Sequence, residues 1–405
     1  MRLSAEDRLN LMVETPETPI NVAALAILDR PGDTAAIRAE VGRRLRDVPA
    51  LCQVLARRGR LRWTPASRLL IVDHVRESTV AAPGDEEALL RMVARLIVQP
   101  MDRSRPLWRM WLIRGLPGDR LAVLFVLHHV VADGLTAINM INILLGGTPT
   151  VSPPRAVPRG RWLPDAGLLR TALSGRRTPD AGLNRPVGSH RRLATVHLDL
   201  DAARQVAHRH GATVNDLVLA LAAGGVRALL GTRHQDPGGL RVRASVAVSL
   251  RTGEEPGNRT GALIVALPVA VPETGARLDE VAAATARAKN GQPPAAPTAV
   301  LTVLGRLGLA RPLSRHQRLI TVVESSLIGP ASPIRLLGAR VQAITAIGNL
   351  AGNVGLSFVA LSYAGRLTLT VHADAAAFPD LPVLVDAIRA DWAALRSPAD
   401  GIGVR

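Results

Sequence analysis

The chain has 405 residues, a formal net charge of +17 and a hydrophobic content of 47%. That length allows one large or two medium domains with a sizeable core. Aromatic residues make up only 2% of the chain, which leaves few rings to stack on bases and argues against a nucleic-acid-binding protein. The single cysteine, Cys52, excludes an internal disulfide and a cysteine-based zinc site.

The excess of positive charge favours an anionic partner, such as a phosphorylated molecule or an anionic membrane surface. Nearly all of the basic residues are arginine, a choice that a GC-rich genome could also explain. No apolar stretch is expected to reach the length that spans a bilayer. The N-terminus, MRLSAEDRLN, has charges where a signal peptide needs an apolar core, so we expect a cytoplasmic protein.

The first hundred residues alternate between short strands and amphipathic helices. Ser4 is expected to cap a first helix, which Pro16 and Pro19 end. Apolar periodicity predicts the following elements: a strand over 21–28, a helix over 34–46, a short strand over 67–74 and a helix over 85–98.

A predicted hairpin, with its turn at 117–119, leads to the stretch that carries the clearest chemistry. The apolar run 121–127 predicts a buried strand and stops at His128 and His129. Adjacent strand residues point to opposite faces, so one histidine should face a cavity and the other the sheet packing. A neutral imidazole is a common general base. Asp133-Gly134 then ends the strand region, and a helix is expected over 135–145.

The pattern His128-His129-x-x-x-Asp133-Gly134 resembles the HHxxxDG signature of the CoA-dependent acyltransferase superfamily, which includes chloramphenicol acetyltransferases and condensation domains. The segment 99–108, ending in Pro106-Leu107-Trp108, is similar to the PLDRSRPLW segment of bacterial wax ester synthases/diacylglycerol acyltransferases. Further segments that resemble this family are Glu14-Thr15-Pro16, Thr213-Val214-Asn215-Asp216, and Ser362-Tyr363 with Ala373-Asp374.

The resemblance implies an α/β fold, an α+β sandwich of two chloramphenicol-acetyltransferase-like subdomains. Each would be a mixed sheet with flanking helices, and an active-site tunnel would lie between them. We place the N-terminal subdomain at 1–150 and the C-terminal one at 191–405. The Pro/Gly/Arg-rich segment 151–190 is the expected crossover linker, with a short helix at about 168–173.

The second half again alternates between strands and helices. Thr213 with Asp216 could form a capping box, or Asp216 could act in the active site; the residues leave both open. Capping does not explain Asn215. The segment 326–330, SLIGP, stands where relatives carry an NVPGP-like turn. The predicted elements are strands over 194–200, 241–250, 263–271, 356–363 and 366–373, and helices over 213–230, 277–320 (interrupted at Pro293 and Pro294) and 380–395.

By resemblance, the chemistry is acyl transfer from acyl-CoA to a hydroxyl or amine acceptor, with acyl-CoA as co-substrate. Neither a metal nor a permanently bound cofactor is expected. His129 is the expected general base, and Asp133 is expected to hold the turn through an arginine. The supporting residues of the motifs are His128, Gly134, Asn215 and Asp216, and the expected substrate-binding residues are Pro106, Leu107 and Trp108.

Three functions stay open. The first is a wax ester or triacylglycerol synthase that uses long-chain acyl-CoA with a fatty alcohol or diacylglycerol, working at the inner face of a membrane or on a lipid droplet. The second is a specialised-metabolite acyltransferase that forms esters or amides, with acyl-CoA or an acyl carrier protein as donor. The third is a non-catalytic relative that acts as a binding protein.

Overall fold

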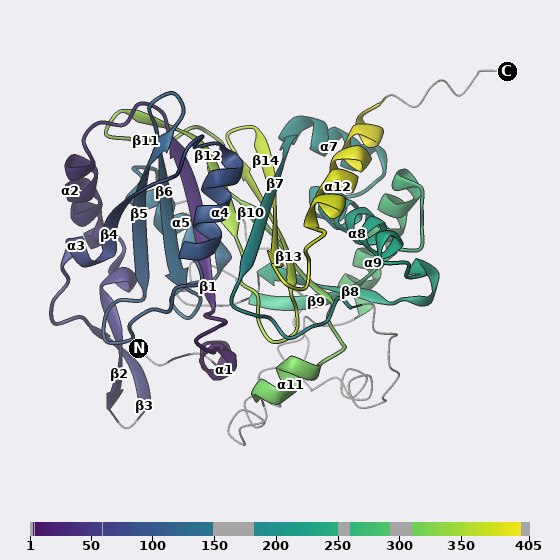
Figure 1. The fold of residues 1–405 in the computed structure, drawn as a ribbon, viewed down its shortest axis with the longest axis horizontal. Coiled ribbons are helices and arrows are strands. Elements are labelled where there is room, and N and C mark those ends of the chain that lie inside the picture. Colours follow the sequence, from purple (N-terminus) through teal and green to yellow (C-terminus); the bar gives the residue numbers. More distant parts are fainter. Residues whose placement is uncertain are drawn as a thin grey trace.

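Two six-stranded mixed sheets lie side by side in the computed structural model (Figure 1). The structure describes residues 3, 5–58, 60–148, 182–249, 260–291 and 310–397. The first sheet has the order β11-β12-β1-β6-β5-β4 and the second has the order β7-β14-β13-β10-β8-β9. The expected fold of two mixed-sheet subdomains is confirmed.

The strands of the first sheet are β1 (Asn21–Leu28), β4 (Val75–Thr79), β5 (Trp108–Leu116), β6 (Arg120–His128), β11 (Arg335–Leu336) and β12 (Ala339–Ile347). Those of the second sheet are β7 (Arg191–Asp199), β8 (Val242–Ser249), β9 (Thr260–Leu267), β10 (Val322–Ile328), β13 (Leu356–Tyr363) and β14 (Arg366–Asp374). A separate hairpin joins β2 (Gln53–Arg58) and β3 (Arg60–Pro65), which the sequence did not lead us to expect.

The helices of the first half are α1 (Ala5–Val13), α2 (Thr34–Arg44), α3 (Ile71–His74), α4 (Glu86–Leu96) and α5 (Gly134–Leu144). Those of the second half are α7 (Leu200–Arg209), α8 (Val214–Thr232), α9 (Thr274–Gly291), α11 (Ala310–His316) and α12 (Leu381–Arg396). Short 3₁₀ turns cover Leu45–Asp47, Pro49–Cys52 and Pro237–Gly239. The predicted helix at 168–173 lies outside the described residues.

The unbroken apolar run of β6 follows from burial on both of its faces. Phe125 and Leu127 pack in a core with α2 and α5, whereas Leu124 and Val126 pack in another core under α4. A strand covered on both sides has no solvent face, so it does not alternate between polar and apolar residues. The predicted strand is therefore confirmed, one residue longer at each end.

The first sheet is completed by two strands from the other half of the chain, β11 and β12. β12 pairs antiparallel with β1, with Leu25 opposite Thr345. The two sheets therefore do not follow the division of the chain at 150 and 191 strictly. Most of the predicted linker, residues 151–181, lies outside the described residues, so its boundaries stay a prediction.

Helix α8 forms the centre of the second half. Its 19 residues are long and apolar enough to cross a membrane by length and composition, contrary to our expectation, but 72% of the apolar window is buried inside the fold. Gly224 lets α8 approach an ion pair in which Arg277 of α9 bonds Asp391 of α12 at 2.6 Å. Helices α8, α9 and α12 pack closely together (Figure 1), so α8 is a core helix of the fold.

The predicted strand over 67–74 was wrong. Residues 71–74 form helix α3, and the following strand is β4. In the segment 326–330, which departs from the turn motif of the relatives, Ser326 to Ile328 belong to β10, and this strand pairs in parallel with β13 from Val323 to Ile328.

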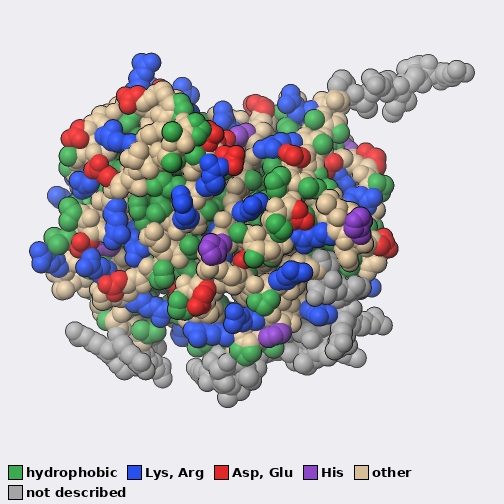
Figure 2. Space-filling view, viewed as in Figure 1, with side chains coloured by type: hydrophobic (Ala, Val, Ile, Leu, Met, Phe, Trp, Pro, Cys, Tyr) green, Lys and Arg blue, Asp and Glu red, His purple; other side chains and the backbone are tan. Residues whose placement is uncertain are grey.

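Lys and Arg side chains are spread over the visible face, with acidic side chains between them (Figure 2). Several arginines of the described residues pair with an acidic neighbour, as Arg43 and Arg44 do with Glu40. The excess charge is thus distributed over this face and does not by itself mark one docking surface.

Candidate active site

A cavity of about 530 Å³ lies between the two sheets. Strands β1, β6 and β12 and helix α5 form one wall, and β8, β10, β13 and the start of α8 form the other. Most of the lining is apolar. The polar or charged residues that line it are His129, Asp133, Arg204, Thr213, Asn215, Ser325, Ser326, Asn349, Ser357 and Ser362.

His129 lies directly after β6 and contributes to this lining. Its backbone N–H donates to the Ile20 carbonyl at 2.9 Å, which holds it beside the start of β1. Burial lowers the pKa of the His129 imidazole below its ordinary value of 6.5. The ring is therefore neutral at neutral pH, which is the form that can take a proton.

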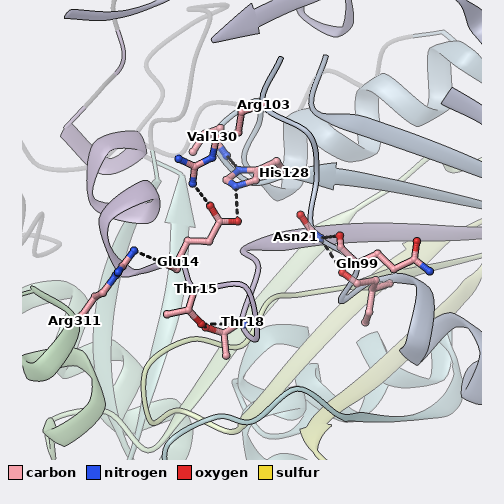
Figure 3. Close-up of polar contacts among 10 residues, drawn as sticks. Glu14, Thr15, Thr18, Asn21, Gln99, Arg103, His128, Val130 and Arg311 are labelled. Atoms are coloured by element: carbon pink, nitrogen blue, oxygen red, sulfur yellow. Dashed lines mark hydrogen bonds and ion pairs between the residues drawn. The ribbon is translucent and has the colours of Figure 1, made fainter. Parts of the chain in front are cut away.

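His128 is not among the residues that line the cavity. Its ring lies in a polar clamp formed by Glu14, Arg103 and the Val130 backbone (Figure 3). Its side chain is 2% exposed. Nδ1 accepts the Val130 backbone N–H at 3.2 Å, so the ring hydrogen is on Nε2 and is donated to Glu14 Oε1 at 3.0 Å. The two histidines thus face different environments, as the alternation along a strand requires.

Glu14 joins several segments at this clamp (Figure 3). Its carboxylate accepts from His128 and from Arg103, and its backbone carbonyl accepts from Arg311 of α11 at 2.8 Å. Burial opposes ionisation of Glu14, but the hydrogen bonds from His128 and Arg103 outweigh it and lower its pKa. Through Glu14, the segment after α1 therefore fixes the position of His128.

Sequence reasoning missed this role of Glu14. It appeared only as part of the N-terminal resemblance, and 114 residues separate it from His128. No local spacing rule connects residues so far apart.

Asp133 caps α5. Its Oδ1 accepts from the Thr136 backbone N–H at 2.9 Å and from the Thr136 hydroxyl at 2.7 Å. A Cβ on Gly134 would lie 3.2 Å from Cδ2 of Leu327 on β10. The glycine therefore lets the start of α5 approach the second sheet. The arginine partner of Asp133 stays a prediction.

The capping box at the start of α8 is confirmed. Asp216 Oδ2 accepts from the Thr213 backbone N–H at 2.8 Å, and the Asp216 N–H donates to Thr213 Oγ1 at 3.2 Å. The other oxygen, Oδ1, accepts from Thr285 of α9 at 2.7 Å. Asn215 lines the cavity whereas Asp216 is not among its lining residues. The capping interpretation of Asp216 is therefore confirmed, and its direct role in the active site stays a prediction.

Pro106, Leu107 and Trp108, the predicted substrate-binding residues, are buried and are not among the residues that line this cavity, so their contact with a substrate stays a prediction. Trp108 donates from Nε1 to the Leu51 carbonyl at 2.8 Å and stacks on His74 with ring centroids 4.4 Å apart. The Leu107 carbonyl accepts the His128 backbone N–H at 3.0 Å. These contacts let the segment support the histidine strand from the core.

Two models of one protein family match most of the chain. The model of the wax ester synthase/diacylglycerol acyltransferase catalytic domain matches residues 3–166 and 159–218. The model of the C-terminal domain of the same family matches residues 256–396. The chain belongs to the wax ester synthase/diacylglycerol acyltransferase family. It is therefore an acyltransferase of that family, as the histidine motif led us to expect.

Individual relatives agree with this family assignment. A Mycobacterium tuberculosis protein provisionally named diacylglycerol O-acyltransferase Rv1760 is 27% identical over 446 residues, covering 94% of this chain and 87% of the relative. The structure of a wax ester synthase/diacylglycerol acyltransferase from Marinobacter aquaeolei VT8 superimposes with a TM-score of 0.76 at 25% identity, covering 98% of both chains.

The fold extends beyond this family. The first condensation domain of the CDA synthetase superimposes with a TM-score of 0.66 at 17% identity, covering 99% of this chain and 97% of that domain. At that identity the likeness concerns the fold alone.

Proposed function

We propose that the chain transfers a long-chain acyl group from acyl-CoA to a hydroxyl acceptor, such as a fatty alcohol or diacylglycerol. The observation that carries this proposal is the position of His129 in the wall of a cavity whose lining is mostly apolar, where burial lowers the pKa of its imidazole. An apolar lining suits hydrocarbon chains, since burying them away from water is favourable. The names of the relatives point to the same substrate class.

The reaction needs one proton shuttle. His129 removes the proton of the acceptor hydroxyl while its oxygen attacks the thioester carbonyl carbon. The tetrahedral intermediate collapses, the carbon–sulfur bond breaks, and the imidazolium returns the proton to the leaving thiolate. An ester and CoA thiol result, without an acyl-enzyme intermediate. Holding both substrates in one cavity removes much of the entropic barrier.

The clamp behind His128 contributes by position. Because Glu14 and Val130 fix the His128 ring from both nitrogens, the backbone between 128 and 130 has little freedom. His129 lies in the middle of this segment, so its ring is held relative to the cavity. A small displacement of the general base lowers the catalytic rate strongly.

Free-thiol release from a panel of acyl-CoAs, with and without a fatty alcohol or diacylglycerol, tests the proposal. We expect release that requires the lipid acceptor and falls by roughly 10²- to 10⁴-fold in His129→Ala. His208→Ala, which removes an exposed histidine on α7, is the matched control and should be unchanged. Since burial lowers the pKa of His129, kcat/KM should fall only below pH 6.5 on the acid side.

Full activity of His129→Ala would contradict the assigned base. Release that no lipid acceptor stimulates, while amines or a carrier-bound acyl donor do, would replace the lipid substrates with those of a specialised-metabolite acyltransferase. No release under any of these conditions would contradict acyl transfer itself.

A further inference from the structure

A buried carboxyl group lies behind the cavity wall that β10 forms. The Glu324 side chain is 0% exposed. Its neighbours in parallel register are Val246 of β8 and Phe358 of β13, both buried and apolar. Oε1 lies 2.7 Å from Ser326 Oγ, whereas Oε2 has no hydrogen-bond partner among the described residues. A buried polar atom without a partner is costly and calls for an explanation.

The surroundings of Glu324 favour its neutral acid form. Burial raises the pKa of Glu324 to about 8, the Ser326 hydrogen bond opposes this rise, and the negative charge of Asp216 adds to it. Asp216, on α8, is the titratable group that acts on Glu324 from the helices; the neighbouring strands present Val246 and Phe358. A neutral acid can also leave Oε2 as an unbonded carbonyl oxygen at a smaller cost than an ionised one.

Ser326 connects this acid to the cavity. It lines the same cavity as His129, and the next residue, Leu327, packs against Gly134 at the start of α5. An ionised Glu324 would force the Ser326 hydroxyl to donate backwards into the wall. A neutral Glu324 can donate to Ser326 Oγ instead, which leaves the serine hydrogen available to the cavity.

We propose that Glu324 donates a hydrogen bond to Ser326 Oγ and thereby directs the Ser326 hydroxyl hydrogen to the carbonyl oxygen of the acyl donor. This inference rests on the proposed function. Negative charge builds on that oxygen as the acceptor attacks, and a donor fixed in advance stabilises it. Ser326 is then a catalytic residue and Glu324 its positioning residue. No bond to either side chain forms or breaks, and the proton shuttle through His129 is unchanged.

Thiol release by four variants over a range of pH tests the inference. Ser326→Ala should lose roughly 10²- to 10³-fold in kcat with little change in KM. Glu324→Leu should lose activity similarly, since nothing then directs the serine. Glu324→Gln keeps an N–H donor and should stay within roughly tenfold of the wild type at neutral pH. Glu77→Gln, the same change at a half-exposed side chain of β4, is the matched control.

The pH profile separates positioning from a structural role. As pH rises through about 8, wild-type kcat should fall because Glu324 ionises and the serine turns to it. This alkaline fall should persist in Glu77→Gln and disappear in Glu324→Gln, whose side chain does not titrate. If Glu324→Leu fails to fold, this comparison still decides the matter.

Three results would overturn the inference. One is wild-type kcat in Ser326→Ala, and another is the same alkaline fall in Glu324→Gln as in the wild type. If either occurs while His129→Ala is inactive, the proposed function stands and only the relay is removed. The third is a wild-type protein that is silent with every donor and acceptor, which would remove both.

Discussion

Replacing Glu324 with Gln should change how stability depends on pH. In the unfolded chain the carboxyl titrates at about 4.5, and in the fold its pKa is about 8. Below pH 4.5 the carboxyl is protonated in both the folded and the unfolded state, so folding does not bury a charge. Between these values the unfolded state loses the proton first, and stability falls as pH rises. Above about pH 8 the carboxyl is ionised in both states, and the folded state bears the full free-energy cost of burying its charge.

The difference between the two pKa values sets the size of the effect. At 1.36 kcal/mol per pKa unit, it corresponds to roughly 5 kcal/mol between acid and alkaline pH, and to roughly 3 kcal/mol at pH 7. Glutamine does not titrate. The free energy of unfolding of Glu324→Gln, relative to that of the wild type, should therefore increase by roughly 5 kcal/mol as pH rises from 4.5 to 8.

Urea unfolding at a series of pH values, followed by tryptophan fluorescence, measures this gain. The m-value should be the same in both proteins, so that the midpoint reports stability alone. Glu77→Gln should show no comparable trend, because its side chain is 44% exposed. A difference between Glu324→Gln and the wild type that stays constant with pH would refute the reasoning. It would mean that Glu324 is already ionised in the fold, which would also remove the donor to Ser326.

Two further predictions concern packing and the histidine clamp. Gly224→Ala places a Cβ on Asp391 Oδ2 and should lower the free energy of unfolding, measured in urea, by roughly 3–5 kcal/mol, because it breaks a buried ion pair. Gly231→Ala, in the same helix but with open space around the new Cβ, should be neutral or slightly stabilising. Equal effects of the two substitutions would contradict the steric argument. Glu14→Ala leaves the buried His128 Nε2–H without its acceptor and should cost about 1–3 kcal/mol and at least tenfold in kcat; unchanged thiol release would show that the clamp does not position the base.

Local patterns in the sequence predicted the elements and the ends of several of them. The predicted helix 85–98 is α4, which begins at Glu86 because Asp85 accepts from the Ala88 N–H at 2.8 Å. The capping box of α8 was also visible from Thr213 and Asp216 alone. Such features involve neighbours within one turn of a helix, so a single sequence contains all of their parts.

Contacts between distant segments could not be predicted in the same way. Nothing near Glu14 indicates that it meets His128, and nothing near Glu324 indicates that its carboxyl is buried instead of exposed. Trp108 shows the reverse case. Its place in a family motif suggested substrate binding, and the structure places its ring in the core, where Leu51 and His74 contact it. The motif alone does not show whether such a residue acts by contact or by support.

The pairing of β1 with β12 has a consequence for synthesis of the chain. About 310 residues separate the two strands, and at 5–20 residues per second the ribosome needs roughly 15 to 60 s to make them. During that time the outer edge of β1 has no partner strand, and apolar edges of this kind pair with other chains. The nascent protein is therefore most exposed to aggregation while its second half is still being made. The first sheet is complete only once β11 and β12, residues 335–347, have been made and have paired with β1.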